Sequence, residues 1–123
     1  MSNIDKSLGA AMERLFNVIE SRRGVDPATS YTANLLKAGE TQITRKIGEE
    51  AIEIILAALS GKKEDVTKES SDLLYHLMVL WASCGLTTED IGSELTRREA
   101  TSGHDEKKNR SNLMPSNQTS SEI

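Results

Sequence analysis

Residues 48 to 59 read GEEAIEIILAAL, and this stretch decides the fold. Three glutamates, Glu49, Glu50 and Glu53, lie close together among Ala, Ile and Leu. At about 100° per residue on a helix they form one stripe, with apolar side chains on both sides of it. A helix that is apolar over so much of its circumference is expected to be buried on most sides. The stretch therefore predicts a packed helix that carries carboxylates into a partly buried setting.

The rest of the chain, 123 residues in all, has the pattern of a helical domain. Apolar residues recur with helical period, no stretch alternates with the period of a strand, and glycines follow the expected helices. Aromatic residues make up only 3% of the chain, which suits close-packed helices better than a β-sandwich. We therefore expect an all-α fold, a four-helix bundle with one short extra helix. The expected helices cover residues 4–23, 31–37, 41–60, 62–83 and, from 87 or 88, to about 99.

Composition separates a helical domain at 1–99 from a polar tail at 100–123. The tail has too few large apolar residues to offset the entropy of ordering, so we expect it to be disordered. The net charge of −4 gives no basic footprint for nucleic acid, and no apolar run approaches the roughly 20 residues that span a bilayer. The single cysteine, Cys84, fits a reducing compartment and is expected in the core. These features predict a soluble cytoplasmic protein.

Residues 62–83 repeat the arrangement of acids. Glu69 and Asp72 are spaced i, i+3, as are Glu50 and Glu53, so each pair lies on one ridge of its helix. The link at Gly61 is short, so the two helices should be antiparallel neighbours. The two acidic pairs are therefore expected to face each other.

Carboxylates that converge in this way repel one another unless a cation lies between them. An all-oxygen set of ligands favours Mg²⁺ or Mn²⁺. The alternative is that each acid pairs with a surface Lys or Arg, since this spacing is common on helices. A di-iron site would need two Glu-x-x-His motifs, which the sequence lacks. The spacing alone leaves the cation site and ordinary surface charge both open.

The helical period also predicts which faces of the two long helices form the core. On residues 41–60 one face consists of Ile43, Ile47, Ala51, Ile54, Ile55 and Ala58, and a second apolar strip of Ile52, Leu56 and Leu59. On residues 62–83 the predicted core face is Val66, Leu73, Leu74, Leu77, Leu80 and Trp81. A body this small buries little on its own, so this apolar surplus predicts at least a dimer.

The order of the motifs carries a resemblance. E-E-x-x-E at Glu49, Glu50 and Glu53, then fifteen residues, then E-x-x-D at Glu69 and Asp72 resembles the all-α, MazG-like nucleoside triphosphate pyrophosphatases. The surrounding stretches are SYTANLLKAGETQITRKIGEEAIEIILAAL at 30–59 and ESSDLLYHLMVLWASCGLTTEDIGSELTRRE at 69–99. They are similar to the phosphoribosyl-ATP pyrophosphatase family, over roughly residues 6 to 99.

The resemblance implies an activity and its residues. The implied reaction is the Mg²⁺-dependent hydrolysis of the nucleotide 1-(5-phosphoribosyl)-ATP to 1-(5-phosphoribosyl)-AMP and pyrophosphate, the second step of histidine biosynthesis. The implied catalytic residues are Glu49, Glu50, Glu53, Glu69 and Asp72. Of these, Glu50, Glu53, Glu69 and Asp72 would hold the metal, and Glu49 would ligate it or orient the attacking water. Relatives are homodimers or larger, and some are fused to a phosphoribosyl-AMP cyclohydrolase domain, which we expect here on a separate chain.

Basic residues should meet the phosphates of such a substrate. Lys46, one turn before Glu49 and Glu50, is the first candidate, and its alternative is a helical ion pair with Glu50. Lys37 and Arg22 are weaker candidates, because charges at helix ends are usually just solvated.

The residues Ser30, Tyr31 and Thr32 match a signature of the resembled family and are expected to contact substrate. The alternative is that Ser30 caps a helix while Tyr31 packs in the core. His76 is expected to be a satisfied histidine of the bundle, hydrogen-bonded to Asp72.

Two other functions compete with this interpretation. One is a house-cleaning pyrophosphatase of free (d)NTPs, which would share the metal motif. The SYTANLL stretch and the lack of an aromatic cluster for stacking a base argue against it. The other is a non-catalytic helical interaction module whose acids are ordinary surface charge.

Overall fold

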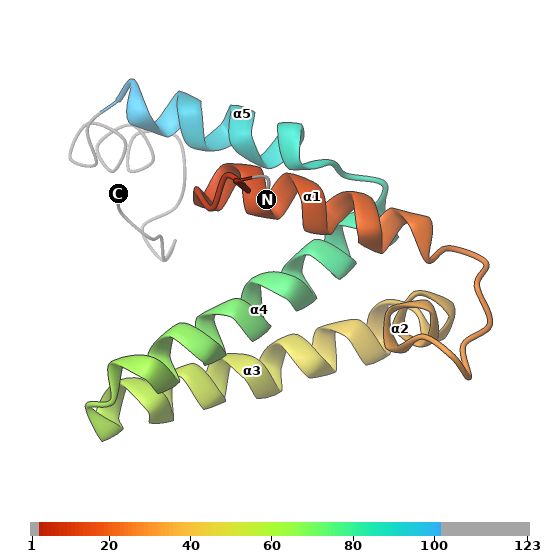
Figure 1. Ribbon diagram of the computed structural model, residues 1–123, viewed down its shortest axis with the longest axis horizontal. Coiled ribbons are helices and arrows are strands. Elements are labelled where there is room, and N and C mark those ends of the chain that lie inside the picture. Colours follow the sequence, from red (N-terminus) through yellow and green to blue (C-terminus); the bar gives the residue numbers. More distant parts are fainter. Residues whose placement is uncertain (1–2, 102–123) are drawn as a thin grey trace, which may run out of the picture. The chain divides into compact units, whose positions relative to one another are not determined.

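The computed structural model describes residues 3–101, and residues 102–123, nearly all of the expected tail, lie outside the described part. The described residues form helices and no strand (Figure 1), which confirms the all-α fold. The helices are α1 (Leu8–Ser21), α2 (Tyr31–Ala38), α3 (Glu40–Ser60), α4 (Lys63–Cys84) and α5 (Thr88–Glu99). In the described part of the chain, no helix combines the length and the hydropathy that crossing a membrane requires.

Helices α3 and α4 form an antiparallel hairpin and lie side by side along their length (Figure 1). The turn between them is tight because Gly61 adopts the left-handed conformation at φ 78°, ψ 8°, which costs a glycine nothing. Its N–H donates to the Ala58 carbonyl at 3.2 Å and so closes the end of α3. The expected antiparallel pair is confirmed.

The core lies at the end of this hairpin that is remote from Gly61. There α1 packs against α4, and α2 packs against both α3 and α4. The fully buried apolar cluster is Phe16, Ile19, Leu35, Ile43, Met78, Val79 and Ala82. Helix α2 reaches α3 through the single residue Gly39, whose φ of 91° and ψ of −173° lie in a region open almost only to glycine.

The predicted core faces of the two long helices are partly wrong. On α4 the buried residues are His76, Met78, Val79 and Ala82, all in its second half, while the predicted face is only partly buried. The reason is that α1, α2 and α3 surround the second half of α4 from several sides, whereas the first half has no such cover. On α3, the predicted core residues Ile55 and Ala58 are exposed, and Ala57, which lies outside both predicted apolar faces, is buried.

Two smaller expectations also fail. Helix α1 begins at Leu8 rather than at residue 4, because the Asp5 carboxylate accepts the Ser7 N–H at 2.9 Å and offers the backbone a turn instead. Cys84 is exposed rather than buried, at the end of α4.

The described chain divides into two units. Residues up to Thr88 form the first, which contains the whole α3–α4 hairpin. The second begins at Glu89 and contains nearly all of α5, on which no residue is buried. On α5, Glu94 accepts hydrogen bonds from Arg97 and Arg98, which lower the pKa of its carboxyl to about 2. The expected domain end at residue 99 stays a prediction.

Candidate functional site

Three carboxylates meet between the helices of the hairpin. Glu50 comes from α3, and Glu69 and Asp72 come from α4. Each offers one carboxylate oxygen, and these oxygens all lie within 4.8 Å of one another. All three residues are partly buried. We call this group the carboxylate seam.

The seam occupies positions that would normally hold apolar packing residues. The buried and half-buried positions of α3 include Ile43, Ile47, Glu50, Ile54 and Ala57, with spacings that alternate between four and three residues. This is the spacing at which one helix packs along another. On α4 the same alternation runs through Glu69, Asp72, His76 and Val79. The acids therefore replace apolar residues in the contact between the two helices.

The carboxylates of the seam repel one another when no cation lies between them. Partial burial, followed by the negative charges of Glu53, Asp72 and Glu50, raises the pKa of Glu69 above its ordinary value of 4.5. Within the described residues, no Lys or Arg forms an ion pair with a seam carboxylate. The alternative of ordinary surface pairing therefore does not describe these three acids. Their oxygens fit a hard divalent cation, which would remove the repulsion.

Glu53 and Glu49 lie at the edge of the seam. Glu53 is exposed and outside the group of three, yet its charge contributes to the raised pKa of Glu69. Glu49 is also exposed and accepts a hydrogen bond from Lys46 Nζ at 3.1 Å. The helical ion pair that was the alternative for Lys46 thus forms with Glu49, at i, i+3, and not with Glu50.

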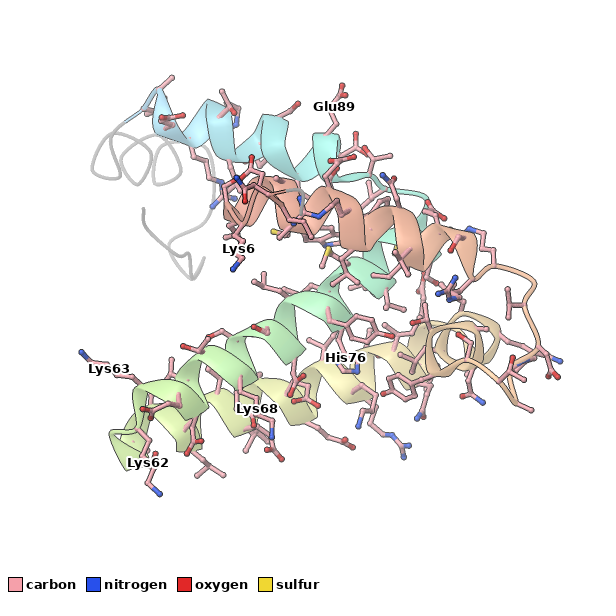
Figure 2. All side chains as sticks on the ribbon, viewed as in Figure 1. Lys6, Lys62, Lys63, Lys68, His76 and Glu89 are labelled. Carbon is pink, nitrogen blue, oxygen red and sulfur yellow. The ribbon has the colours of Figure 1, made fainter. Side chains whose placement is uncertain are left out.

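Tyr31 lies against His76 and Tyr75 of α4 rather than in the core. Ser30 caps α2, since its Oγ accepts the Ala33 N–H at 3.1 Å, as expected. Tyr31 is 53% exposed, so the alternative that it packs in the core is wrong. Its hydroxyl lies 3.1 Å from Nε2 of the buried His76 (labelled in Figure 2).

The hydrogen bonds of His76 fix its tautomer. Its Nδ1 lies 2.8 Å from the backbone carbonyl of Asp72, and a carbonyl can only accept. Nδ1 therefore carries the proton, and Nε2 accepts the hydroxyl proton of Tyr31. The expected bond between His76 and Asp72 exists, but it reaches the backbone and not the carboxylate.

Tyr75 completes a cluster of aromatic rings that the sequence interpretation missed. The rings of Tyr31 and Tyr75 are stacked at 6.3 Å with 24° between their planes, and Tyr75 meets His76 edge-on at 4.9 Å. The Tyr75 hydroxyl lies 2.5 Å from Thr32 Oγ1. We call Tyr31, Tyr75 and His76 the aromatic cluster. The sequence-based expectation that the chain lacks an aromatic cluster is therefore wrong. Tyr75 and His76 follow Asp72 by three and four residues, and this spacing could have indicated the cluster.

The other two basic candidates lie elsewhere. Lys37 lines a hollow of about 530 Å³ together with Arg23, Gly24, Val25, Pro27, Ala33 and Leu36. Arg22 donates from Nη1 to Ser21 Oγ at 2.9 Å. Neither residue contacts a seam carboxylate in the described part of the chain.

The fold and the seam together define an all-α protein with a candidate site for a divalent cation between two antiparallel helices. The sequence profile of one family, the phosphoribosyl-ATP pyrophosphohydrolases, matches residues 12–99, which include the seam and the aromatic cluster. The chain belongs to this family.

Individual relatives agree with this assignment. A phosphoribosyl-ATP pyrophosphatase of Paramagnetospirillum magneticum is 52% identical over 99 residues, which are 80% of this chain and 91% of the relative. One from Rhodospirillum rubrum is 54% identical over 96 residues, 78% of this chain and 82% of the relative. One from Azospirillum brasilense is 48% identical over 103 residues, 84% of this chain and 93% of the relative.

Proposed function

We propose that this chain hydrolyses 1-(5-phosphoribosyl)-ATP to 1-(5-phosphoribosyl)-AMP and pyrophosphate, the second step of histidine biosynthesis. The observation that carries the proposal is the convergence of Glu50, Glu69 and Asp72 in a chain of the family named for this reaction. The substrate is a polyanion, and an acidic seam would repel it unless a divalent cation were present. The reaction therefore requires such a cation.

Mg²⁺ is the proposed cation, and Mn²⁺ is the alternative with the same ligand chemistry. Glu50, Glu69 and Asp72 would hold it, with Glu53 at the edge as a fourth ligand. The support is the all-oxygen donor set, the lack of ion-pair partners in the described residues and the raised pKa of Glu69. When bound there, the cation would neutralise negative charge on the phosphate oxygens of the substrate.

The chain's own residues have distinct parts in the hydrolysis. Water attacks the α-phosphorus, the bond from that phosphorus to the bridging oxygen breaks, and pyrophosphate leaves. Glu49, exposed at the edge of the seam, orients the attacking water. Lys46 meets phosphate oxygens once it exchanges its Glu49 partner for the substrate, because its side chain is still partly exposed.

Residues outside the seam complete the proposed substrate site. Ser30 holds the start of α2 in place, Tyr31 belongs to the aromatic cluster, and Thr32 is hydrogen-bonded to Tyr75 of that cluster. Arg22, just after α1, and Lys37, in the last turn of α2, carry positive charge away from the seam, and they would take only the outer phosphate oxygens of the substrate.

The proposal includes a homodimer in the cytoplasm. Four large side chains of α3 are exposed within one chain: Ile52 at 60%, Ile55 at 57%, Leu56 at 61% and Leu59 at 81%. Burying them against a second copy would remove a large apolar surface from water, and the second copy then helps to complete the site. The product passes to a phosphoribosyl-AMP cyclohydrolase on a separate chain. Residues 100–123 serve as a polar tail outside the catalytic domain.

The experiment is a comparison of substrates and cations. Pyrophosphate release is measured with 1-(5-phosphoribosyl)-ATP and with a panel of dNTPs, each in Mg²⁺ and in EDTA. The proposal predicts turnover of 1-(5-phosphoribosyl)-ATP that is lost in EDTA. Preference for a dNTP would indicate the house-cleaning function, and no cation-dependent turnover of any substrate would refute both enzymatic functions.

A further inference from the structure

The exposed ring of Tyr31 has the properties of a surface on which a flat group could stack. Its hydroxyl is held by His76, and its ring is held by Tyr75, yet half of it faces solvent. Tyr75 is in turn tied to Thr32. The ring is therefore fixed before any ligand arrives, and a ligand that stacks on it loses little entropy in ordering it.

The position of this ring relative to the seam matches the layout of a nucleotide. His76 follows Asp72 by four residues, so the aromatic cluster lies about one helical turn, roughly 6 Å, along α4 from the seam. A ribose and its α-phosphate span a comparable length. A base on the ring would thus place its α-phosphate at the carboxylates.

Lys46 links the two places. Its pKa is raised first by the hydrogen bond to Glu49 and then by the nearby charges of Tyr31, Glu49 and Glu50. Its ammonium group donates to Glu49, the neighbour of the seam residue Glu50, at 3.1 Å, and the charges of Tyr31 and Glu50 act on its pKa as well. The ring of Tyr31 would thus meet the base, the ammonium group of Lys46 would meet the phosphates, and the carboxylates would meet the cation.

The substrate's own chemistry favours recognition through the face of the base. Its second ribose is attached to N1 of adenine, so the edge used in base pairing is blocked. Both faces of the ring stay open, and stacking on an aromatic side chain needs only a face.

We propose that the exposed face of Tyr31, backed by Tyr75 and held by His76, stacks on the adenine ring of the substrate. This inference rests on the proposed function, because it assigns a subsite to that reaction's nucleotide. Tyr31 is then a binding residue for the base, while Tyr75 and His76 are positioning residues that act through it.

The test compares the two products of the reaction as ligands, since only one contains the base. Dissociation constants of 1-(5-phosphoribosyl)-AMP and of pyrophosphate are measured by calorimetry in Mg²⁺ for the wild type and for Tyr31→Leu. We expect Tyr31→Leu to raise the dissociation constant of 1-(5-phosphoribosyl)-AMP about 5- to 150-fold and that of pyrophosphate less than about twofold. Tyr31→Phe keeps the ring, so it should weaken the binding of the nucleotide less than Tyr31→Leu does.

The other outcomes each overturn the inference. Equal weakening of both products would show that Tyr31 only holds α2 in place, and no weakening would show that the base lies elsewhere. A loss in Tyr31→Phe as large as in Tyr31→Leu would assign the effect to the hydroxyl. Val18→Ala, which removes other half-exposed apolar surface on α1, serves as the control and should change neither constant.

Calorimetry keeps this test separate from that of the proposed function. Binding does not require turnover, so a chain that binds 1-(5-phosphoribosyl)-AMP through Tyr31 but fails to hydrolyse 1-(5-phosphoribosyl)-ATP would refute the reaction and keep the subsite. If the wild type hydrolyses the substrate and Tyr31→Leu binds both products normally, the reaction is kept and the subsite is refuted. A wild type that binds pyrophosphate but not 1-(5-phosphoribosyl)-AMP would refute the subsite and leave the reaction to be tested by turnover alone.

Discussion

The side of α3 that packs against α4 carries a carboxylate, Glu50, in line with Ile43, Ile47 and Ala57, whereas its opposite side exposes Ile52, Ile55, Leu56 and Leu59. Charge is thus half-buried and large apolar groups are exposed, the reverse of the usual distribution. Each side lacks a different partner within the single chain. The packed side needs positive charge, and the exposed side needs apolar surface. The comparison gives α3 two unlike sides, which fit the two proposed associations, one with a cation and one with a second copy of the chain.

The largest effect on turnover should follow from removing carboxylate charges between α3 and α4. Asp72→Asn removes one of the three charges of the seam, and Glu53→Gln removes the charge at its edge. Each should lower turnover by at least about 100-fold, because every ligand of a catalytic cation is needed to place it. Steady-state release of pyrophosphate measures this, with circular dichroism to show that the helices persist.

Glu64→Gln is the matched control for these variants. Glu64 is an acid in the first turn of the same helix, α4, outside the seam, so its loss should leave turnover unchanged. An Asp72→Asn protein with wild-type turnover would refute the assignment of the seam.

A charge placed on the exposed apolar side of α3 tests whether this side forms the proposed dimer contact. Ile55→Glu should weaken self-association by at least about 100-fold, since an unpaired charge is costly to bury in an apolar interface. Light scattering over a range of protein concentrations measures this. Val18→Glu on α1 is the control and should associate as the wild type does, while a monomeric wild type at micromolar concentration would contradict the proposed dimer.

Gly39 sets the direction of α3 relative to α2. Gly39→Ala forces a side chain into a backbone conformation that costs about 1–3 kcal/mol, although no atom would obstruct the added Cβ. Gly48→Ala, inside α3 and equally unobstructed, should instead stabilise the protein by about 0.5–1 kcal/mol. Urea denaturation distinguishes the two, and equal effects would show that the corner at Gly39 is not strained.

A smaller effect concerns the pH dependence of the protein without a cation. The raised pKa of Glu69 means that its contribution to stability is fully present below its ordinary value of 4.5 and is lost as pH rises through its folded value. In EDTA, Glu69→Gln should therefore melt at a higher temperature than the wild type at neutral pH, and the difference should vanish at low pH. Saturating Mg²⁺ should reverse the order at neutral pH, because only the wild type binds it fully.

The smallest effect is expected where an acid already has partners. The hydrogen bonds from Arg97 and then Arg98 lower the pKa of Glu94 to about 2, so its contribution to stability is present above 4.5 and is lost as pH falls through about 2. Glu94 and Arg97 are exposed and Arg98 is only partly buried, so solvent screens these ion pairs. Glu94→Gln should therefore hardly change the melting temperature at neutral pH and should leave turnover unchanged. Thermal melts at pH 7 and pH 3 measure this, and a marked loss of turnover would contradict it.

The helices were predictable from the sequence because their ends are set locally. Gly61 and Gly85 close α3 and α4, and Ser30 caps α2, as the glycine and serine positions indicate. The start of α1 was misplaced because a side chain, Asp5, competes for the backbone. The buried faces were harder, since they depend on which other helices cover each half of α4.

The acids of the seam were predictable to the extent that two spacings on two neighbouring helices define a common face. Glu50, Glu69 and Asp72 meet as those spacings suggest. The contacts of Tyr31 were not predictable, because its partner His76 is 45 positions away and the angle between α2 and α4 decides the contact. The same holds for Thr32 and Tyr75.

The tight turn at Gly61 makes the seam a property of one continuous segment, from Glu40 to Cys84. A segment of this kind can be inherited as a unit, while the helices around it change. Exchange of α2 alone would present other side chains to His76 and Tyr75 while the carboxylates stay where they are. Under the proposed function, the hairpin would then keep the residues of phosphate cleavage, while a change in the preceding helix would alter the contacts made to the nucleotide.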